Sequence, residues 1–407
     1  MSSRKRIIVL TSWSMKEGLI QSYTLPYLKI ISQLQDHTIY LVTLEKEAFQ
    51  CSKEEKTTLL QSLADQNIHW IPKKYVPFGL QAFVRMFFTL IGLFFLTKRK
   101  KIDVVHAICT PSGMLGYILS KLTGAKLIID SFEPHSDMML QSNTWSKKGL
   151  AYKTLFSFEK KQAKHAHVWI AANRDMKDYA LKHYHAEPRS YQWKPACVNI
   201  DQFLVSKSKT KQLRSELGFL DDDIVCVCAS KIGGMYPEKE IVDFFKAAQD
   251  YWKGRFKVLL LNNYPKEKLV DLCHSANVNP SIIVQRLVPY EDIPLYLSVG
   301  DFAFSPLKPI PANRYTTPIK NGEYWAASLP TVIPKNISED SDIIKKEKIG
   351  AVLKDLSFPS YQIAIGEIDQ LLQEKNNQQL SSKIKEVAKK YRDFSIAQHV
   401  YQEVYGS

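Results

Sequence analysis

Short apolar runs alternate with helix-forming segments along nearly the whole chain, and this alternation constrains the fold more than any other feature. In the first half the runs lie at 7–11, 37–44, 67–71, 103–107, 125–130 and 167–171. Short apolar runs separated by helical segments are typical of parallel strands covered by helices on both faces. The pattern therefore predicts a doubly wound α/β sheet, whose ligands bind beyond the carboxyl ends of its strands.

The second half of the chain repeats this alternation. Its runs lie at 224–229, 256–261, 282–284, 301–305, 329–333 and 350–353, and the last part, 361–405, is predicted to be helical. A segment at 192–212, rich in lysine and serine toward its end, is predicted to connect the two halves. Since 407 residues are too many for one ordinary core, the sequence predicts two α/β domains.

Charge and cysteine content narrow the classes of partner. The formal net charge of +14 favours an anionic partner, such as a nucleotide or an anionic membrane face. No nucleic-acid-binding motif is present, so nucleic acid is not expected as a partner. The six cysteines form no C-x-x-C pattern, so we expect no metal site and a reducing, cytoplasmic location. The apolar run that follows the basic N-terminus is short, which predicts a first strand rather than a signal peptide.

The most apolar region lies at 78–96 and is followed by four basic residues at 98–101. Gln81 and Arg85 interrupt it, and the uncharged part is far shorter than the roughly 20 residues of a membrane-spanning helix. Two interpretations remain open: a helix buried against the first sheet, or a helix at a membrane surface. In the second interpretation, the basic residues at 98–101 would meet anionic lipid headgroups and the aromatic side chains would enter the lipid. These aromatic residues are Phe83, Phe87, Phe88, Phe94 and Phe95.

The segment 314–333 has the features of a phosphate-binding site. Thr317 can cap a helix whose first residue is Pro318. Lys320 and Glu323 then lie on neighbouring parts of one face. A helix N-terminus with a lysine nearby can hold a phosphate, and a carboxylate can accept hydrogen bonds from sugar hydroxyls. The segment is predicted to bind a nucleotide-sugar diphosphate; the alternative is an ordinary amphipathic helix.

Residues 318–333 read P-x-K-x-x-E-Y-x-A-x-x-L-P-x-x-I, which resembles the retaining glycosyltransferases of family 4. The segments 198–203 and 288–306 are similar to that family as well. The resemblance implies the GT-B fold, in which two Rossmann-like domains face each other across a cleft and a C-terminal helix crosses back to the first domain. The expected domains are 1–203, an acceptor-binding domain on which 390–407 packs, and 204–389, a nucleotide-sugar-binding domain.

The resemblance also implies the residues of a donor site. Glu323 matches the glutamate that accepts hydrogen bonds from the ribose, whereas Tyr315 stands where the family has another glutamate. Lys320 and Lys231 would stabilise the diphosphate leaving group, with Lys239 as a further candidate, and no metal or other cofactor is expected. The remaining expected donor contacts are Thr316, Thr317, Gly233, Gly234 and Arg286.

The first domain is expected to hold the acceptor. The resemblance implies catalytic roles for His135 and Glu133 and acceptor contacts for Glu17, Gly18 and Asp130. For His135 and for the loop at Glu17, a solvated polar loop is the alternative.

The expected reaction is transfer of a sugar from a UDP- or GDP-linked donor to a glycan or lipid-linked acceptor with retained configuration. The expected role is cell-envelope or exopolysaccharide synthesis, and the expected location is the cytoplasm or the inner face of the membrane. Two alternatives remain: a GT-B sugar-nucleotide epimerase, and a non-catalytic scaffold, which Tyr315 favours. A dehydrogenase is not expected, because no G-x-G-x-x-G follows the first strand.

Overall fold

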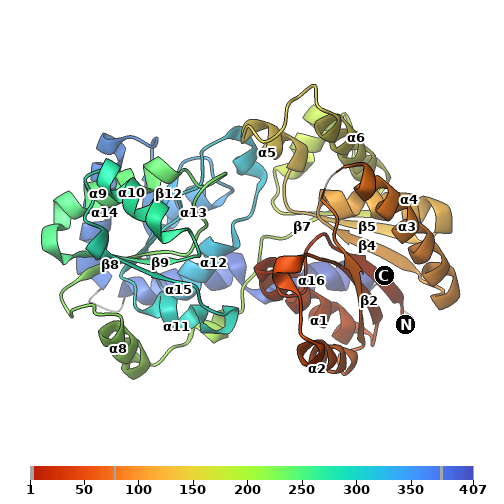
Figure 1. Ribbon diagram of the computed structural model, residues 1–407, viewed down its shortest axis with the longest axis horizontal. Coiled ribbons are helices and arrows are strands. Elements are labelled where there is room, and N and C mark those ends of the chain that lie inside the picture. Colours follow the sequence, from red (N-terminus) through yellow and green to blue (C-terminus); the bar gives the residue numbers. More distant parts are fainter. Residues whose placement is uncertain (1–3, 78, 376–378, 407) are drawn as a thin grey trace. The chain divides into compact units, whose positions relative to one another are not determined.

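The computed structural model describes residues 4–77, 79–375 and 379–406, and for residues 80, 82, 83, 374 and 375 it describes the backbone only. The chain forms two compact units (Figure 1). Unit 1 comprises Met1–Pro195 and Ser395–Ser407, and unit 2 comprises Ala196–Phe394.

Unit 1 is built on a seven-stranded sheet in the order β3-β2-β1-β4-β5-β6-β7, and all its strand pairs are parallel. The strands are β1 (Arg6–Leu10), β2 (Thr38–Glu45), β3 (Ile68–Lys74), β4 (Val104–Ile108), β5 (Lys126–Ser131), β6 (Val168–Ala171) and β7 (Tyr191–Trp193). The helices are α1 (Leu25–Leu34), α2 (Lys53–Ala64), α3 (Leu80–Lys100), α4 (Thr110–Thr123), α5 (His135–Gln141), α6 (Leu150–His165), α7 (Met176–Tyr179) and α16 (Phe394–Tyr405).

Unit 2 is built on a six-stranded sheet in the order β10-β9-β8-β11-β12-β13, and it too is parallel throughout. The strands are β8 (Ile224–Cys228), β9 (Phe256–Leu261), β10 (Ile283–Arg286), β11 (Phe302–Phe304), β12 (Thr331–Pro334) and β13 (Gly350–Leu353). The helices are α8 (Lys207–Glu216), α9 (Glu238–Trp252), α10 (Lys266–Ser275), α11 (Ile293–Ser298), α12 (Ile319–Ala326), α13 (Asp340–Glu347), α14 (Phe358–Lys375) and α15 (Gln379–Arg392).

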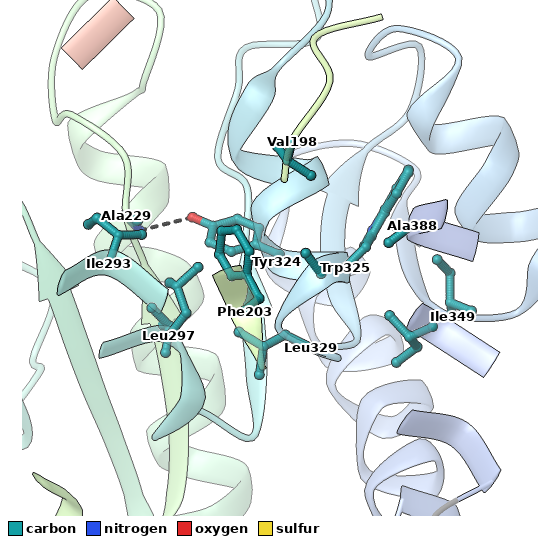
Figure 2. Packing of buried hydrophobic residues seen from close by; sticks show 14 of the residues in the cluster. Val198, Phe203, Ala229, Ile293, Leu297, Tyr324, Trp325, Leu329, Ile349 and Ala388 are labelled. Carbon is teal, nitrogen blue, oxygen red and sulfur yellow. Dashed lines mark hydrogen bonds between the residues drawn. The ribbon is translucent and has the colours of Figure 1, made fainter. Parts of the chain in front are cut away.

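Helix α12 is enclosed in the core of unit 2. Figure 2 shows Tyr324 and Trp325 of this helix among side chains from several other elements, including Phe203, Ile293 and Leu297. Both rings are fully buried. The packing fixes the helix relative to the sheet, because a close-packed interior leaves such large side chains few alternative positions.

The C-terminal helix joins unit 1, as predicted. The hydroxyl of Tyr401 donates to Asp130 (2.9 Å), and Lys5 Nζ donates to the backbone oxygen of Tyr405 (3.0 Å). The return to unit 1 begins at Ser395 rather than at residue 390.

The first boundary between the units differs from the predicted one at 203/204. Val198, Ile200 and Phe203 lie in the core of unit 2, so the chain enters that unit at Ala196. The predicted connection at 192–212 is also wrong in part, because it contains β7 and the start of α8. The lysine- and serine-rich part is helical because Ser206 caps it by accepting from the Lys209 N–H (3.5 Å), and Leu213 is buried on one side.

The apolar region 78–96 falls largely in α3, and Phe78 lies outside the described residues. Helix α3 lies beside α4 (Figure 1) and buries Leu93 and Thr97. Among the described residues, no helix combines the length and hydropathy needed to cross a membrane.

Candidate functional site

The carboxyl edge of the unit 2 sheet has a switch point between β8 and β11. Strand β8 is followed in sequence by β9 on one side of it, whereas β11 pairs with its other side. The loops after β8 and β11 therefore leave the sheet in opposite directions, the arrangement that forms ligand crevices in α/β folds. The two loops contact each other, because the Lys308 N–H donates to the Met235 carbonyl (3.0 Å).

The loop after β8 carries three of the predicted donor residues. Lys231 is exposed, and Gly233 and Gly234 have φ values of 100° and 63°. These left-handed conformations explain the glycine pair, since other L-residues rarely adopt them. The loop is held at its start by Asn262, whose side-chain amide donates to the Ser230 carbonyl (2.7 Å).

Lys320 and Glu323 form an ion pair on α12. Lys320 Nζ lies 2.9 Å from Glu323 Oε2, and the glutamate side chain is 0% exposed. Its other oxygen, Oε1, is buried and accepts no hydrogen bond from any residue the structure describes. A buried acceptor without a donor is costly, so Oε1 has the property expected of an atom that meets a ligand hydroxyl.

Two tyrosines lie in the neighbourhood of Glu323. Burial and the charge of Glu323 both raise the pKa of Tyr290, which follows β10 in sequence. Tyr324, the neighbour of Glu323 in sequence, accepts a hydrogen bond from the Ala229 N–H at the end of β8 (2.9 Å; Figure 2). Helix α12 is thereby tied to the start of the loop that carries Lys231.

Thr317 is not the cap of α12. The N-cap position is taken by Pro318, and no side chain caps the helix. The Thr317 hydroxyl oxygen instead accepts hydrogen bonds from the Ala196 N–H (2.7 Å) and from Arg392 Nη1 (2.7 Å). Thr317 thus lies one residue before the N-cap position, and its hydroxyl joins the start of α12 to the segment where the chain enters unit 2.

The remaining predicted donor residues are spread over this edge. Thr316 is buried and its hydroxyl donates to the Asn313 carbonyl (2.9 Å), while Tyr315 is half-buried at the end of a short helical turn. Arg286 is exposed at the end of β10. The structure does not support a diphosphate contact for Lys239, because its Nζ pairs with Asp243 (2.6 Å) along the exposed side of α9.

In unit 1, the loop after β1 is held by Glu17. The carboxylate accepts from the Ser14 N–H (2.5 Å) and pairs with Lys46 Nζ (2.6 Å). Gly18 follows it and is exposed, with open space around its α-carbon. Glu17 thus shapes the loop, and the acceptor contacts predicted for Glu17 and Gly18 stay predictions.

Asp130 is not placed to bind an acceptor. It is 1% exposed at the end of β5, and its carboxylate accepts from the hydroxyls of Tyr23 (3.1 Å) and Tyr401 (2.9 Å). Lys194, also fully buried, lies 3.0 Å from it. The prediction was wrong because the strand end is covered by aromatic side chains, among them one from the C-terminal helix.

Glu133 and His135 do come together after β5. His135 Nδ1 lies 2.7 Å from Glu133 Oε1, and both side chains are partly exposed. Burial lowers the pKa of His135, but the hydrogen bond and charge of Glu133 and the charge of Glu159 outweigh it, so the net pKa is raised. The negative charge of Glu133 therefore favours the protonated form of His135, in which both ring nitrogens are hydrogen-bond donors.

Glu159 of α6 was missed by the sequence analysis. It is buried, accepts from the Ser136 N–H (3.0 Å) and the Tyr184 hydroxyl (3.1 Å), and burial raises its pKa to about 7. Arg392 was missed as well: it is buried against Asp340, Thr317 and the ring of Trp325. Both residues lie in polar helices, and no local pattern marks a charged residue that will be buried.

The described residues contain no group of histidine, cysteine, aspartate or glutamate side chains arranged to hold a metal ion. The cysteines among them are free.

Comparison with solved structures gives the class of fold. The Anabaena protein HepE, solved in complex with UDP and glucose, matches with a TM-score of 0.74 at 14% identity, covering 99% of this chain and 100% of that one. WaaG, a glycosyltransferase involved in lipopolysaccharide biosynthesis, matches with a TM-score of 0.73 at 12% identity, covering 99% and 100%. Sucrose-phosphate synthase from Thermosynechococcus elongatus matches with a TM-score of 0.75 at 12% identity, covering 99% and 98%. The fold is that of the GT-B glycosyltransferases, as predicted.

Comparison with curated proteins gives a particular relative. The chain is 22% identical, over 296 residues, to the Escherichia coli enzyme UDP-Gal:alpha-D-GlcNAc-diphosphoundecaprenol alpha-1,3-galactosyltransferase. The match covers 70% of this chain and 68% of the relative. No protein-family model matches the chain.

Proposed function

We propose that the chain is a glycosyltransferase that moves a hexose from a UDP-sugar to a lipid-linked saccharide with retention of configuration. The observation that carries the proposal is Glu323, a buried carboxylate paired with Lys320, whose second oxygen accepts no hydrogen bond from the residues that the structure describes. A ribose supplies two adjacent hydroxyls, which match such an acceptor. Because Glu323 is enclosed, the neighbouring side chains have to give way when the nucleotide binds.

The diphosphate would lie at the cationic side of this pair. Lys320 on α12 and Lys231 in the loop after β8 place two ammonium groups on segments joined by the bond from Ala229 to Tyr324. Fixed positive charge stabilises a departing diphosphate more than the intact donor, since negative charge develops as the glycosidic bond breaks. Gly233 and Gly234 would let the backbone approach the same group.

The other unit would bind the acceptor. The Glu133–His135 pair lies at the carboxyl end of a strand of unit 1, the edge where α/β sheets bind ligands. A protonated His135 suits an acceptor that itself carries a phosphate, which is the class of acceptor that the E. coli relative uses. A role in cell-envelope or exopolysaccharide synthesis follows from such an acceptor, and a lipid anchor would place the enzyme at the inner face of a membrane.

A second candidate is a non-catalytic scaffold that binds nucleotide sugars without turnover. The observation that favours it is Tyr315, which stands where the resemblance places a glutamate beside the donor sugar. A tyrosine offers one hydroxyl there instead of a carboxylate.

The decisive experiment is a transfer assay with UDP-galactose, UDP-glucose and UDP-N-acetylglucosamine on a synthetic polyprenyl-diphosphate-linked N-acetylglucosamine. We expect transfer from one donor, and the proton coupling constant at the new anomeric carbon should match the configuration of the donor. An inverted product would contradict retention. UDP binding without transfer from any donor, also with other lipid-linked sugars, would favour the scaffold.

A further inference from the structure

One face of α3 is apolar although it is exposed. Val84, Phe87, Phe88, Ile91 and Phe95 follow the three- and four-residue spacing of a helix, and their side chains are 38 to 65% exposed. The opposite side buries Leu93 and Thr97 against the rest of unit 1. We call these five residues the apolar face of α3; Phe94, predicted to belong to such a face, is half-buried, and the side chain of Phe83 lies outside the description.

The apolar face ends in positive charge. Lys98 and Arg99 come three and four residues after Phe95, so they continue the same face by one turn, and Lys100 and Lys101 follow. No acidic residue occurs between Leu80 and Lys101. Lys98 also donates to the Thr123 carbonyl (3.1 Å), which joins the end of α3 to the end of α4.

We propose that the apolar face of α3 docks unit 1 onto an anionic lipid surface, with the phenylalanines in the acyl boundary and the basic residues at the headgroups. An exposed cluster of three phenylalanines is unusual on a soluble protein and marks an interaction site. A helix of this type lies in the plane of the interface, where aromatic groups bury and basic groups meet lipid phosphates.

Charge decides between a bilayer and a second copy of the chain. The formal net charge is +14, so two copies repel each other, whereas an anionic bilayer attracts each of them. The helix of a second copy offers no acidic residue to the basic end of the face, whereas the phosphates of an anionic headgroup layer neutralise it. This docking goes beyond the proposed transfer reaction and stands without it, because vesicle binding is measured with no donor or acceptor.

The test is sedimentation of the full chain with phosphatidylcholine vesicles that contain or lack phosphatidylglycerol. We expect binding to the anionic vesicles and about tenfold weaker binding to the neutral ones, with the difference shrinking as salt is added. The variant Phe87→Ser/Phe88→Ser/Phe95→Ser should bind at least about tenfold more weakly. The variant Arg99→Gln/Lys101→Gln should lose about fivefold per charge on anionic vesicles alone.

Two variants on unit 2 serve as matched controls. Leu220→Ser/Leu287→Ser/Ile363→Ser replaces three side chains as exposed as the phenylalanines, and Lys207→Gln/Lys209→Gln removes two exposed charges from α8. Both should bind vesicles like the unchanged chain, and thermal melting of every variant verifies folding. Equal vesicle binding by the phenylalanine variant would overturn the proposal. The proposal would also be overturned if the unchanged chain bound no vesicles but formed a dimer in sedimentation velocity, and if the phenylalanine variant abolished that dimer.

Discussion

The ammonium of Lys320 lies 2.9 Å from Oε2 of Glu323, a carboxylate that is fully enclosed in unit 2. Lys320 is itself 30% exposed, so the pair joins a buried acceptor to the surface of its unit. The enclosed carboxylate determines how substitutions at this pair should behave.

Removing Lys320 alone should destabilise the protein. Lys320→Met leaves a buried carboxylate without its cation, which costs about 3–5 kcal/mol in comparable cases. Lys320→Met/Glu323→Gln removes both charges and should regain most of that loss. Urea unfolding of Lys320→Met, Glu323→Gln and the double variant measures the coupling free energy between the two side chains. Additive losses of stability would show that they do not stabilise each other.

Lys231 should matter for turnover rather than for folding. Lys231→Gln removes one positive charge from the proposed diphosphate position, and we expect kcat to fall by about 10²–10³-fold. Its side chain is exposed, so the melting temperature should stay constant. Lys239→Gln is the matched control, because Lys239 is exposed and pairs with Asp243 on α9. A similar loss of activity in both variants would refute a specific role for Lys231.

Thr317→Val tests whether this hydroxyl is structural. The substitution removes the acceptor of two hydrogen bonds, from the Ala196 N–H and from Arg392. The Ala196 N–H then loses its partner in a partly buried region, and Arg392 Nη1 keeps only its longer bond to the Ala196 carbonyl (3.3 Å), so the free energy of unfolding should fall by about 1–3 kcal/mol. Thr317→Ser keeps the oxygen and should restore most of it. Unchanged stability with weakened UDP binding would assign Thr317 to the ligand instead.

The sheets and the position of α12 follow from sequence, whereas the charged interior does not. Apolar runs located the strands of both units except β7, because strand periodicity is local, and the Pro318–Glu323 spacing placed α12. Lys194, Arg392, Glu159 and Asp130 are buried by partners far away in the chain. Tyr401, for instance, reaches Asp130 only because α16 returns to unit 1.

Contacts between distant parts of the chain also decide the environment of α3. Its sequence alone allowed a buried helix or an interfacial one, because composition does not tell which face of the helix the rest of the unit covers. The structure buries Leu93 and leaves Phe88 exposed, so the described part of unit 1 covers only one side of the helix.

Glu159 should make stability depend on pH near neutrality. Its pKa is raised to about 7 in the folded protein, above the ordinary value of 4.5. Between these values the folded state binds more protons than the unfolded state, so stability falls as pH rises from about 4.5 through 7. Glu159→Gln removes this titration. The free energy of unfolding of this variant, relative to that of the unchanged chain, should therefore rise by up to about 3 kcal/mol between pH 4.5 and pH 8.

His135 titrates in the same direction, because its raised pKa also favours the protonated folded state. The Glu159→Gln/His135→Gln variant therefore shows how much the free energy of unfolding still depends on pH when neither group titrates. Parallel curves of unfolding free energy against pH for Glu159→Gln and the unchanged chain would contradict the raised pKa of Glu159.

The central claim is that Glu323 and Lys320 form the nucleotide site, and titration calorimetry with UDP tests it most directly. UDP should bind the unchanged chain and the control Glu267→Gln, which replaces an exposed glutamate of α10, with equal affinity. Glu323→Gln should bind UDP at least about tenfold more weakly, because one hydrogen bond to a charged acceptor contributes about 1.5–3 kcal/mol. Equal UDP affinity in all three proteins would contradict the account.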